Sequence, residues 1–211
     1  MPLNRLATVA DQGVYYVANN GATGVATAAA PTSYSDTAPM LVLQNKTAVS
    51  STGPSIYMDY IRAYETVAGT GATGATIKMQ LDTTIATGGT LLVPVSPNSI
   101  SGQASVAAPR IQPTGIAASS AVRVIVGNLV TIPTTTTPLA VNTEFYLKFG
   151  GADAFQSLQV NGTAVTATFS WNAKALAPCV ISPGWSLSLQ LLLLNQSAAS
   201  TWAWELGWVE Y

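Results

Sequence analysis

The sequence lacks histidine and has few residues of any kind that carry reactive chemistry. Among its 211 residues are no His, one Cys, eight Lys or Arg and nine Asp or Glu, so that only 8% are charged. Soluble domains usually contain about 25% charged residues. Without histidine the chain has no Ser-His-Asp or Cys-His arrangement and lacks the commonest metal ligand. One cysteine excludes a disulfide within the chain, and with no His it excludes an ordinary zinc site.

The few charges are spread singly along the chain, with a net charge of −1. Binding to phosphates requires clustered Lys and Arg, and no cluster is present. The longest leucine run, residues 191–194, is far too short to span a membrane. Asp11 and Gln12 interrupt the N-terminus before it could serve as a secretion leader. We therefore expect no contact with nucleic acid or membrane and synthesis in a cytoplasm.

Two pairs of carboxylates could in principle hydrolyse glycosidic bonds: Asp59 with Glu65, and Glu205 with Glu210. On one strand, Asp59 and Glu65 would share a face roughly 20 Å apart at about 3.3 Å per residue, which is too far for a catalytic pair. We interpret Asp59, Arg62 and Glu65 as a solvated or interface charge trio. We expect no enzymatic activity, no metal, no cofactor and no small-molecule ligand.

Two further motifs have structural interpretations. The glycine-rich stretch 69–76 lacks the Gly-Lys-Ser/Thr ending of a phosphate-binding loop, so it predicts an ordinary loop. Cys179 lies among Ala, Pro, Val and Ile residues, which predicts a buried, inert thiol.

The C-terminal stretch 183–211 has the clearest pattern in the chain. Leucines alternate with Ser and Gln over 186–193, and tryptophans alternate with other residues over 202–208. Alternation with a period of two is typical of strands that bury one face. With the polar turn 195–200 between them, the two strands predict a hairpin whose aromatic face closes a β core. The alternative is an exposed platform of Trp202, Trp204 and Trp208 on which sugars stack.

Similar patterns occur through the rest of the chain. A strand is favoured over a helix at 55–67 because Tyr and Ile are enriched there. In the strand at 76–83, alternation places Ile77 and Met79 inward, and Gln80 and Asp82 outward. The other predicted strands are 40–43, 90–95, 121–132 with a turn or bulge at Gly127-Asn128, 143–149 and 162–171.

These patterns predict an all-β chain of two parts. Residues 1–38, rich in Ala, Gly, Thr and Ser, predict an extended, irregular N-terminal arm, although 14–17 could form a short strand. Residues 39–211 predict one jelly-roll-like β-sandwich. The polar but nearly uncharged surface suits close packing against neighbouring subunits, because burying a hydroxyl or methyl group costs far less than burying a charge.

Four segments carry a resemblance to a known family: GGTLLVPVSPN (88–98), VGNLVTIP (126–133), TEFYLKFG (143–150) and the stretch 183–211. Together they resemble a family of tailed-bacteriophage virion structural proteins, over roughly Ile56 to Tyr211. The most specific piece is the end: a Pro-Gly turn, an alternating leucine strand, NQSAAS and an aromatic strand. Family members often carry a basic or imidazole-bearing residue before the Pro-Gly turn and within the leucine strand, and this chain has none there.

The resemblance implies a capsid or accessory head component located in the virion after assembly in the host cytoplasm. We expect a protein that decorates or cements the capsid, as a homotrimer bound to the major capsid protein. The expected interface residues are in the arm and in the threonine loop: Tyr15, Tyr16, Tyr34, Thr134, Thr135, Thr136 and Thr137. The alternatives are a carbohydrate- or receptor-binding β module of the virion and the major shell protein of a small icosahedral virus. The lack of a basic arm disfavours the last of these.

Overall fold

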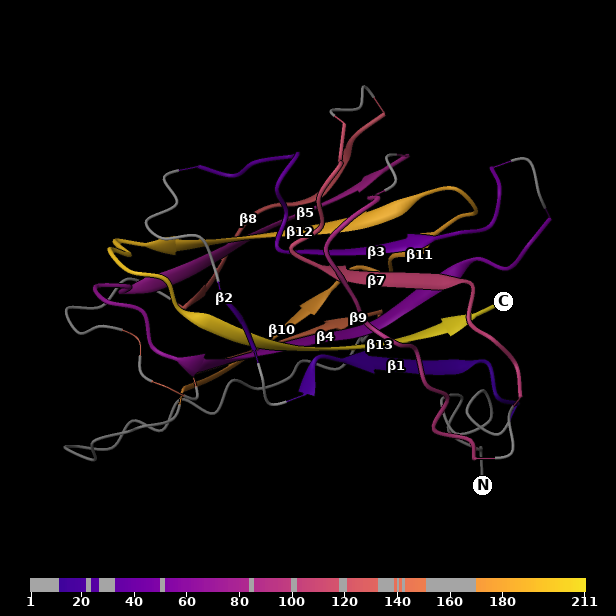
Figure 1. Ribbon diagram of the computed structural model, residues 1–211, viewed down its shortest axis with the longest axis horizontal. Coiled ribbons are helices and arrows are strands. Elements are labelled where there is room, and N and C mark those ends of the chain that lie inside the picture. The colour runs from indigo at the N-terminus through magenta and orange to yellow at the C-terminus, as the bar shows by residue number, and fades with distance from the viewer. Residues whose placement is uncertain are drawn as a thin grey trace.

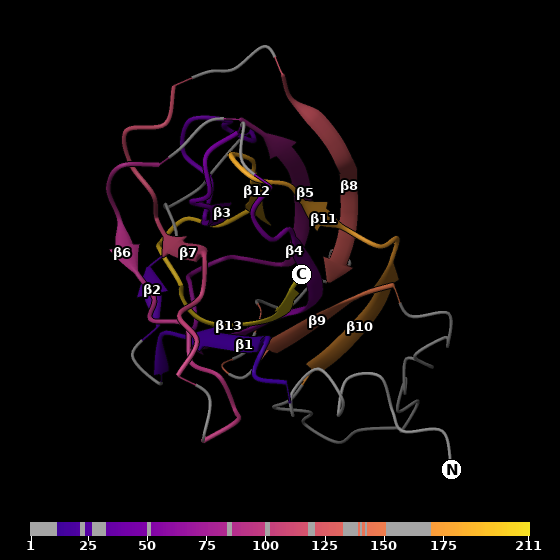
Figure 2. The same cartoon turned by 90° about the vertical axis from the view of Figure 1, so that its right-hand side faces the viewer.

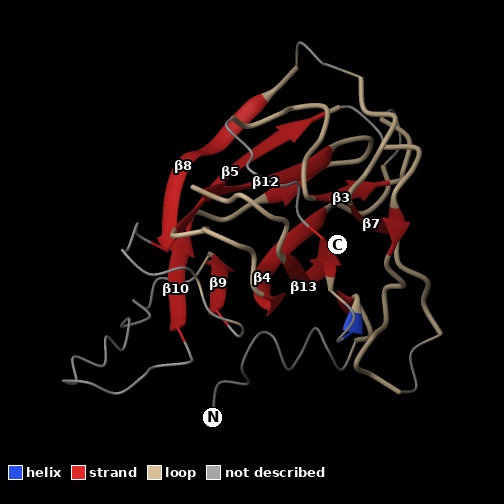
Figure 3. Cartoon of the chain, turned by 60° about the vertical axis from the view of Figure 1, so that its left-hand side comes forward, coloured by secondary structure: helices blue, strands red, loops and turns tan. Residues whose placement is uncertain are grey.

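The computed structural model describes residues 12–21, 24–26, 33–49, 52–83, 86–99, 102–117, 121–132, 139, 141, 143–150 and 170–211. These ranges consist of strands and their connections, without an α-helix; the short blue element in Figure 3 is a 3₁₀ turn at Gly21. Accordingly, no helix in the described part of the chain is long and apolar enough to cross a membrane. The all-β prediction is confirmed.

One layer of the molecule is a seven-stranded sheet. Its main path runs β1–β13–β4–β9–β10, while β2 pairs with β13 and β11 with β4. All pairs are antiparallel except β9–β10, which is parallel. The strands are β1 (Tyr15–Asn19), β2 (Val25–Ala26), β4 (Ile56–Val67), β9 (Thr143–Phe149), β10 (Ser170–Leu176), β11 (Val180–Ile181) and β13 (Thr201–Glu210).

The other layer is a six-stranded antiparallel sheet in the order β6–β7–β3–β12–β5–β8. Figures 1 and 2 show the two sheets stacked face to face, as in a β-sandwich. The strands of the six-stranded sheet are β3 (Leu41–Asn45), β5 (Gly74–Asp82), β6 (Thr90–Leu91), β7 (Ala107–Ile111), β8 (Arg123–Ile132) and β12 (Ser186–Leu194).

The predicted C-terminal hairpin is wrong in its pairing, although both strands form. β12 belongs to the six-stranded sheet and β13 to the seven-stranded sheet, so the turn at 195–200 carries the chain from one layer to the other. Leu187, Leu189 and Trp204 are buried in one core between the layers. The two apolar faces therefore meet across the sandwich, which buries both of them more fully than a pair within one sheet would.

β4 is a strand, as predicted, but its alternation changes phase. Trp208 lies opposite Met58 and Gly207 opposite Tyr60, which leaves Asp59 as an extra residue in a β-bulge. Ile56, Met58 and Ile61 are buried in the core. Because one extra residue moves every later side chain to the opposite face, Tyr60 points outward and not into the core as its spacing from Ile56 indicated.

The bulge predicted in β8 is confirmed. Met79 and Ile77 on β5 are two positions apart, but their partners on β8, Val126 and Leu129, are three positions apart. β8 therefore has one extra residue at this point. Gly127 lies in this interval, as the sequence predicted.

The prediction that Gln80 and Asp82 face solvent is wrong, because both are buried, as are Ser188 and Gln190 on β12. A segment preceding β3, residues 33–40, crosses this side of the six-stranded sheet and covers part of the polar row. The polar alternation was thus correct, but the segment 33–40 covers part of its face.

The described part of the predicted arm is attached to the sandwich. β1 pairs with β13 over five residues, Tyr16 is only 2% exposed, and Ala18 is fully buried. The ring of Tyr16 stacks on Trp208 with centroids 6.2 Å apart. The short strand that the sequence allowed at 14–17 therefore forms, at residues 15–19, and supplies an edge strand and core side chains.

Candidate functional site

The outer face of the seven-stranded sheet gathers tyrosines and charges from four strands. We call this surface the tyrosine face. Because consecutive residues alternate, the neighbours of the core side chains on β1, β4, β9 and β13 all point to it. No strand of the described chain packs against it, because the other sheet lies on the opposite side (Figure 2). Its members are Tyr15, Asp59, Tyr60, Arg62, Tyr64, Glu144, Tyr146, Lys148 and Glu205.

Two ion pairs cross the tyrosine face between β4 and β9. Arg62 binds Glu144 with two nitrogens, Nε at 2.7 Å from Oε1 and Nη2 at 3.4 Å from Oε2. The Glu144 side chain is largely buried, and the hydrogen bond that Arg62 donates to this carboxylate raises the pKa of Arg62. Lys148 Nζ pairs with Asp59 Oδ1, and both side chains are mostly buried. Charge-assisted pairs, and two-point pairs such as Arg62–Glu144 in particular, fix side-chain geometry.

Two tyrosine hydroxyls donate to carboxylates on the same face. Tyr15 donates to Asp59 Oδ2 at 2.9 Å, and Tyr60 donates to Glu205 Oε1 at 2.7 Å. Burial, followed by the neighbouring carboxylate, raises the pKa of both hydroxyls well above the usual value. The hydroxyls therefore remain protonated donors at any physiological pH.

The face is also shaped by aromatic packing. The rings of Tyr60 and Tyr146 stack with centroids 5.5 Å apart, and the Arg62 guanidinium lies 5.8 Å from the centre of the Tyr64 ring. Beside Arg62 and Tyr64 the surface is hollowed by about 300 Å³, and Asn19, Gly21, Trp204 and Glu205 complete the lining. Such a surface offers flat rings, paired charges and a recess.

A second surface is formed by β6 and the chain that follows it. Leu91, Val93 and Val95 are 51%, 73% and 54% exposed, and their alternation places them on one side of an extended segment, here called the aliphatic strap. The backbone of Val95 exchanges two hydrogen bonds with Val17 on β1. The strap therefore joins the edges of the two sheets, at the flank where Figure 2 shows β6, and holds three aliphatic side chains in solvent.

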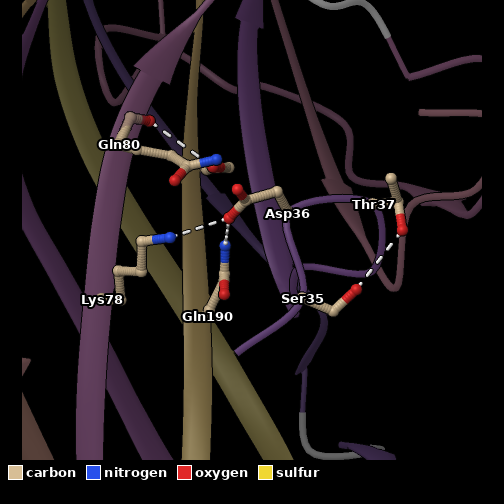
Figure 4. Close-up of polar contacts among 7 residues, drawn as sticks. Ser35, Asp36, Thr37, Lys78, Gln80 and Gln190 are labelled. Atoms are coloured by element: carbon tan, nitrogen blue, oxygen red, sulfur yellow. Dashed lines mark hydrogen bonds and ion pairs between the residues drawn. The ribbon is translucent and has the colours of Figure 1, made fainter. Parts of the chain in front are cut away.

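A third cluster lies on the outer side of the six-stranded sheet, where residues 33–40 cross it (Figure 4). Asp36 Oδ1 accepts from Lys78 Nζ and from Gln190 Nε2, each at 2.8 Å. The hydrogen bond from Lys78, then that from Gln190, lowers the pKa of Asp36. Tyr34 donates to Thr76 Oγ1 at 2.7 Å. A hollow of about 360 Å³ lies alongside, between this segment, residues 112–114 and Gln190. These contacts fasten the segment to its own sheet.

The predicted interface residues lie in different parts of the structure. Tyr15 is half-buried on the tyrosine face, and Tyr34 is half-buried in the Asp36 cluster. Tyr16 lies in the core, so its use as a contact residue for a partner is wrong. Thr134, Thr135, Thr136 and Thr137 lie outside the described residues.

The tryptophan platform does not exist on the surface, since Trp202, Trp204 and Trp208 are at most 1% exposed. The interpretation of these residues as core is confirmed, and Cys179 is buried as predicted, with burial raising its pKa to about 12. Among the described residues, no group of three or more His, Cys, Asp or Glu side chains could hold a metal ion.

Sequence reasoning placed only part of the tyrosine face. The trio of Asp59, Arg62 and Glu65 is split, because Asp59 and Arg62 belong to the face whereas Glu65 is fully buried. Tyr60 was missed as a surface residue, because a bulge of one residue in β4 decides which face it occupies and the alternation alone did not indicate that bulge. The alternation of 143–149, with Phe145 and Leu147 inward, did place Tyr146 on the outer side.

No family model matches the chain, and no match was found among curated proteins or solved structures.

Proposed function

We propose that this protein is a structural component of a tailed-phage particle that decorates or cements the capsid by protein–protein contacts. The sequence resemblance over residues 56–211 suggests the class. The observation that carries the capsid contact is the aliphatic strap, where Leu91, Val93 and Val95 remain exposed on a segment tied to both sheets. A rigid, exposed apolar row is typical of a surface that a partner covers.

We infer in addition that the sandwich is a jelly roll. The chain passes repeatedly between the layers: β3 and β5 lie in one sheet and β4 in the other, and β8 and β12 lie in one sheet and β9, β10 and β11, between them in the sequence, in the other. Strands of the first half pair with strands of the second half, as β3 does with β12 and β4 with β13. This arrangement corresponds to a chain folded double and wrapped around one core.

In this proposal the work of the protein is mechanical. The major capsid protein covers the strap, and copies of the chain, as a homotrimer, bind together. Several weak contacts of this kind give avidity without any single strong bond. The chain would contribute apolar area and preformed geometry, because its core is fixed by buried aromatic side chains from β9 and β13.

Immunogold labelling of intact particles by electron microscopy tests the location. The expected result is label distributed over the head. Label confined to the tail tip would instead support receptor binding, and the absence of label from purified particles would overturn the proposal.

Two matched variants test the strap. Val93→Asp introduces a charge at the centre of the strap and should lower head occupancy at least tenfold, because an unpaired charge would be buried at the contact. Val49→Asp is the control, since Val49 is 70% exposed on the loop between β3 and β4 and is not part of the strap. Equal occupancy of the two variants would contradict a role for the strap.

A further inference from the structure

We propose that the tyrosine face is the surface on which a second copy of this chain docks. The inference deepens the proposed function by locating the contact between copies. It is tested on the free protein, so its failure can be distinguished from a failure of capsid binding.

The few charges of the chain are concentrated on the tyrosine face. The chain has 8 basic and 9 acidic residues, 17 in all, and five of them lie on this single sheet face. A soluble surface needs charges for solvation, and exposed ion pairs add little stability. On the tyrosine face the charged side chains are instead paired and partly buried, in a chain that has few charged residues. The five residues are Asp59, Arg62, Glu144, Lys148 and Glu205.

The three carboxylates of the tyrosine face already have hydrogen-bond donors within the chain. Glu144 is bound by Arg62, Asp59 by Lys148 and the Tyr15 hydroxyl, and Glu205 by the Tyr60 hydroxyl. Covering an unpaired carboxylate is expensive, but covering one that keeps its donors costs much less. The face can therefore be buried by a partner that brings no countercharge.

The charge of the face also bears on the occupant. Three carboxylates and two cations give the face a charge of −1 (−3 + 2), which is too balanced to select nucleic acid or a strongly charged protein. A nearly balanced face of tyrosines, which are enriched in the cores of interfaces, is compatible with a second copy of this nearly uncharged chain. Arg62 is 41% exposed in its side chain and lies beside the 300 Å³ hollow with Glu205. It can offer its remaining donors to a carboxylate of the second copy.

Sedimentation velocity and light scattering on the purified chain test the proposal. We expect a mass that is a multiple of the 21.8 kDa chain. Tyr146→Ser removes a ring from the stacked pair, and Tyr64→Lys adds an unpaired charge beside the hollow. Each should shift the mass to that of the single chain, or raise the dissociation constant at least tenfold. Far-UV circular dichroism and thermal unfolding verify that the variants are folded.

Tyr34→Ser is the matched control, because Tyr34 is also a half-buried tyrosine but lies on the outer side of the other sheet. It should leave the mass unchanged. A monomeric wild-type chain at micromolar concentration would overturn the proposal, as would dissociation by Tyr34→Ser without dissociation by Tyr146→Ser. If Tyr146→Ser fails to fold, Tyr64→Lys decides, because the only ring contact of Tyr64 described here is with Arg62.

Discussion

The carboxyl group of Glu65, near the C-terminal end of β4, accepts a hydrogen bond from the backbone amide of Gly69, 3.3 Å away. Glu65 is fully buried, and its other oxygen, Oε2, has no hydrogen-bond partner among the described residues. Desolvation raises the pKa of Glu65 to about 7, against the opposing effect of hydrogen bonds from Gly69 and Ser200. A buried carboxyl group with one unsatisfied oxygen is more stable when protonated.

This relationship predicts a pH-dependent stability. The pKa is raised in the folded state, so the folded chain binds the proton more tightly than the unfolded chain, whose value is near 4.5. The contribution of Glu65 is thus fully present below about pH 4.5 and is lost as the pH rises towards 7. Glu65→Gln should be more stable than the wild type at pH 8 by up to about 3 kcal/mol, and the difference should shrink at pH 4.5. Denaturant unfolding at the two pH values measures it.

Glu210 provides the control at the other end of β13. Its carboxylate is also buried, but it accepts hydrogen bonds from Ser105 Oγ, the Val106 amide and Trp208 Nε1. Glu210→Gln removes a satisfied acceptor and should destabilise the protein by about 1–3 kcal/mol at pH 8. A Glu65→Gln variant whose difference from wild type is the same at both pH values would show that Glu65 is not the titrating group.

Gly207 is required where the tyrosine face is most crowded. A Cβ at this position would overlap the Tyr60 ring and lie 2.6 Å from the Tyr15 hydroxyl. Gly207→Ala should therefore displace both rings, destabilise the fold by about 1–3 kcal/mol and weaken association between copies. Thermal unfolding and sedimentation measure the two effects.

Gly127→Ala is the comparison for that substitution. Gly127 is also a strand glycine, but a Cβ there would meet no atom within 4 Å. Its effect on the free energy of unfolding should stay within about 0.5 kcal/mol. If both glycine variants behave alike, the crowding at Gly207 has no energetic consequence.

The sequence patterns predicted which segments are strands better than how the strands are arranged. Alternation marks a strand because one face must be buried, and this holds for β4, β5, β9, β12 and β13. It does not say which sheet a strand joins. β12 and β13 are connected by a short turn, and a hairpin and a crossover between layers bury the same leucines and tryptophans.

The candidate surfaces were harder to predict for related reasons. Tyr60 changes face because of one bulged residue, and Gln80 is covered by a segment more than 40 positions earlier in the chain. Glu65 continues the core face of β4, a position where a carboxylate is not expected. Each outcome depends on contacts between distant segments, whereas local patterning reports only on neighbours in the sequence.

The Asp36 cluster should control the local opening of residues 33–40 without controlling the global fold. Asp36→Ala removes the ion pair with Lys78 and the acceptor of the buried Gln190 amide. Because the Asp36 side chain is 46% exposed, the cost to global stability should stay below about 1 kcal/mol. Hydrogen exchange of a peptide covering 33–40 should nevertheless become several-fold faster.

Lowering the pH should have the same effect on residues 33–40 as Asp36→Ala. The folded-state pKa of Asp36 is lowered, so its contribution is present above the unfolded value near 3.8 and is lost as the pH falls through the folded value. Protection of the segment should decrease below about pH 4 in the wild type and not in Asp36→Ala. Equal protection in the two proteins at neutral pH would mean that other contacts hold the segment.

The attachment of β1 leads to a prediction about the N-terminal region. Deleting residues 1–21 would expose the edge of β13 and remove the Tyr16 ring from its stack on Trp208, so the truncated chain should fail to fold stably. Tyr16→Ala isolates the core contribution and should cost about 3–5 kcal/mol, as for other large aromatic side chains. Tyr16→Phe loses only the hydroxyl bond to the Gln103 carbonyl, 3.2 Å long, and should cost about 1 kcal/mol. Denaturant unfolding separates the three proteins. A truncated chain as stable as the wild type would mean that β1 is a dispensable edge, free to pair with a neighbouring subunit.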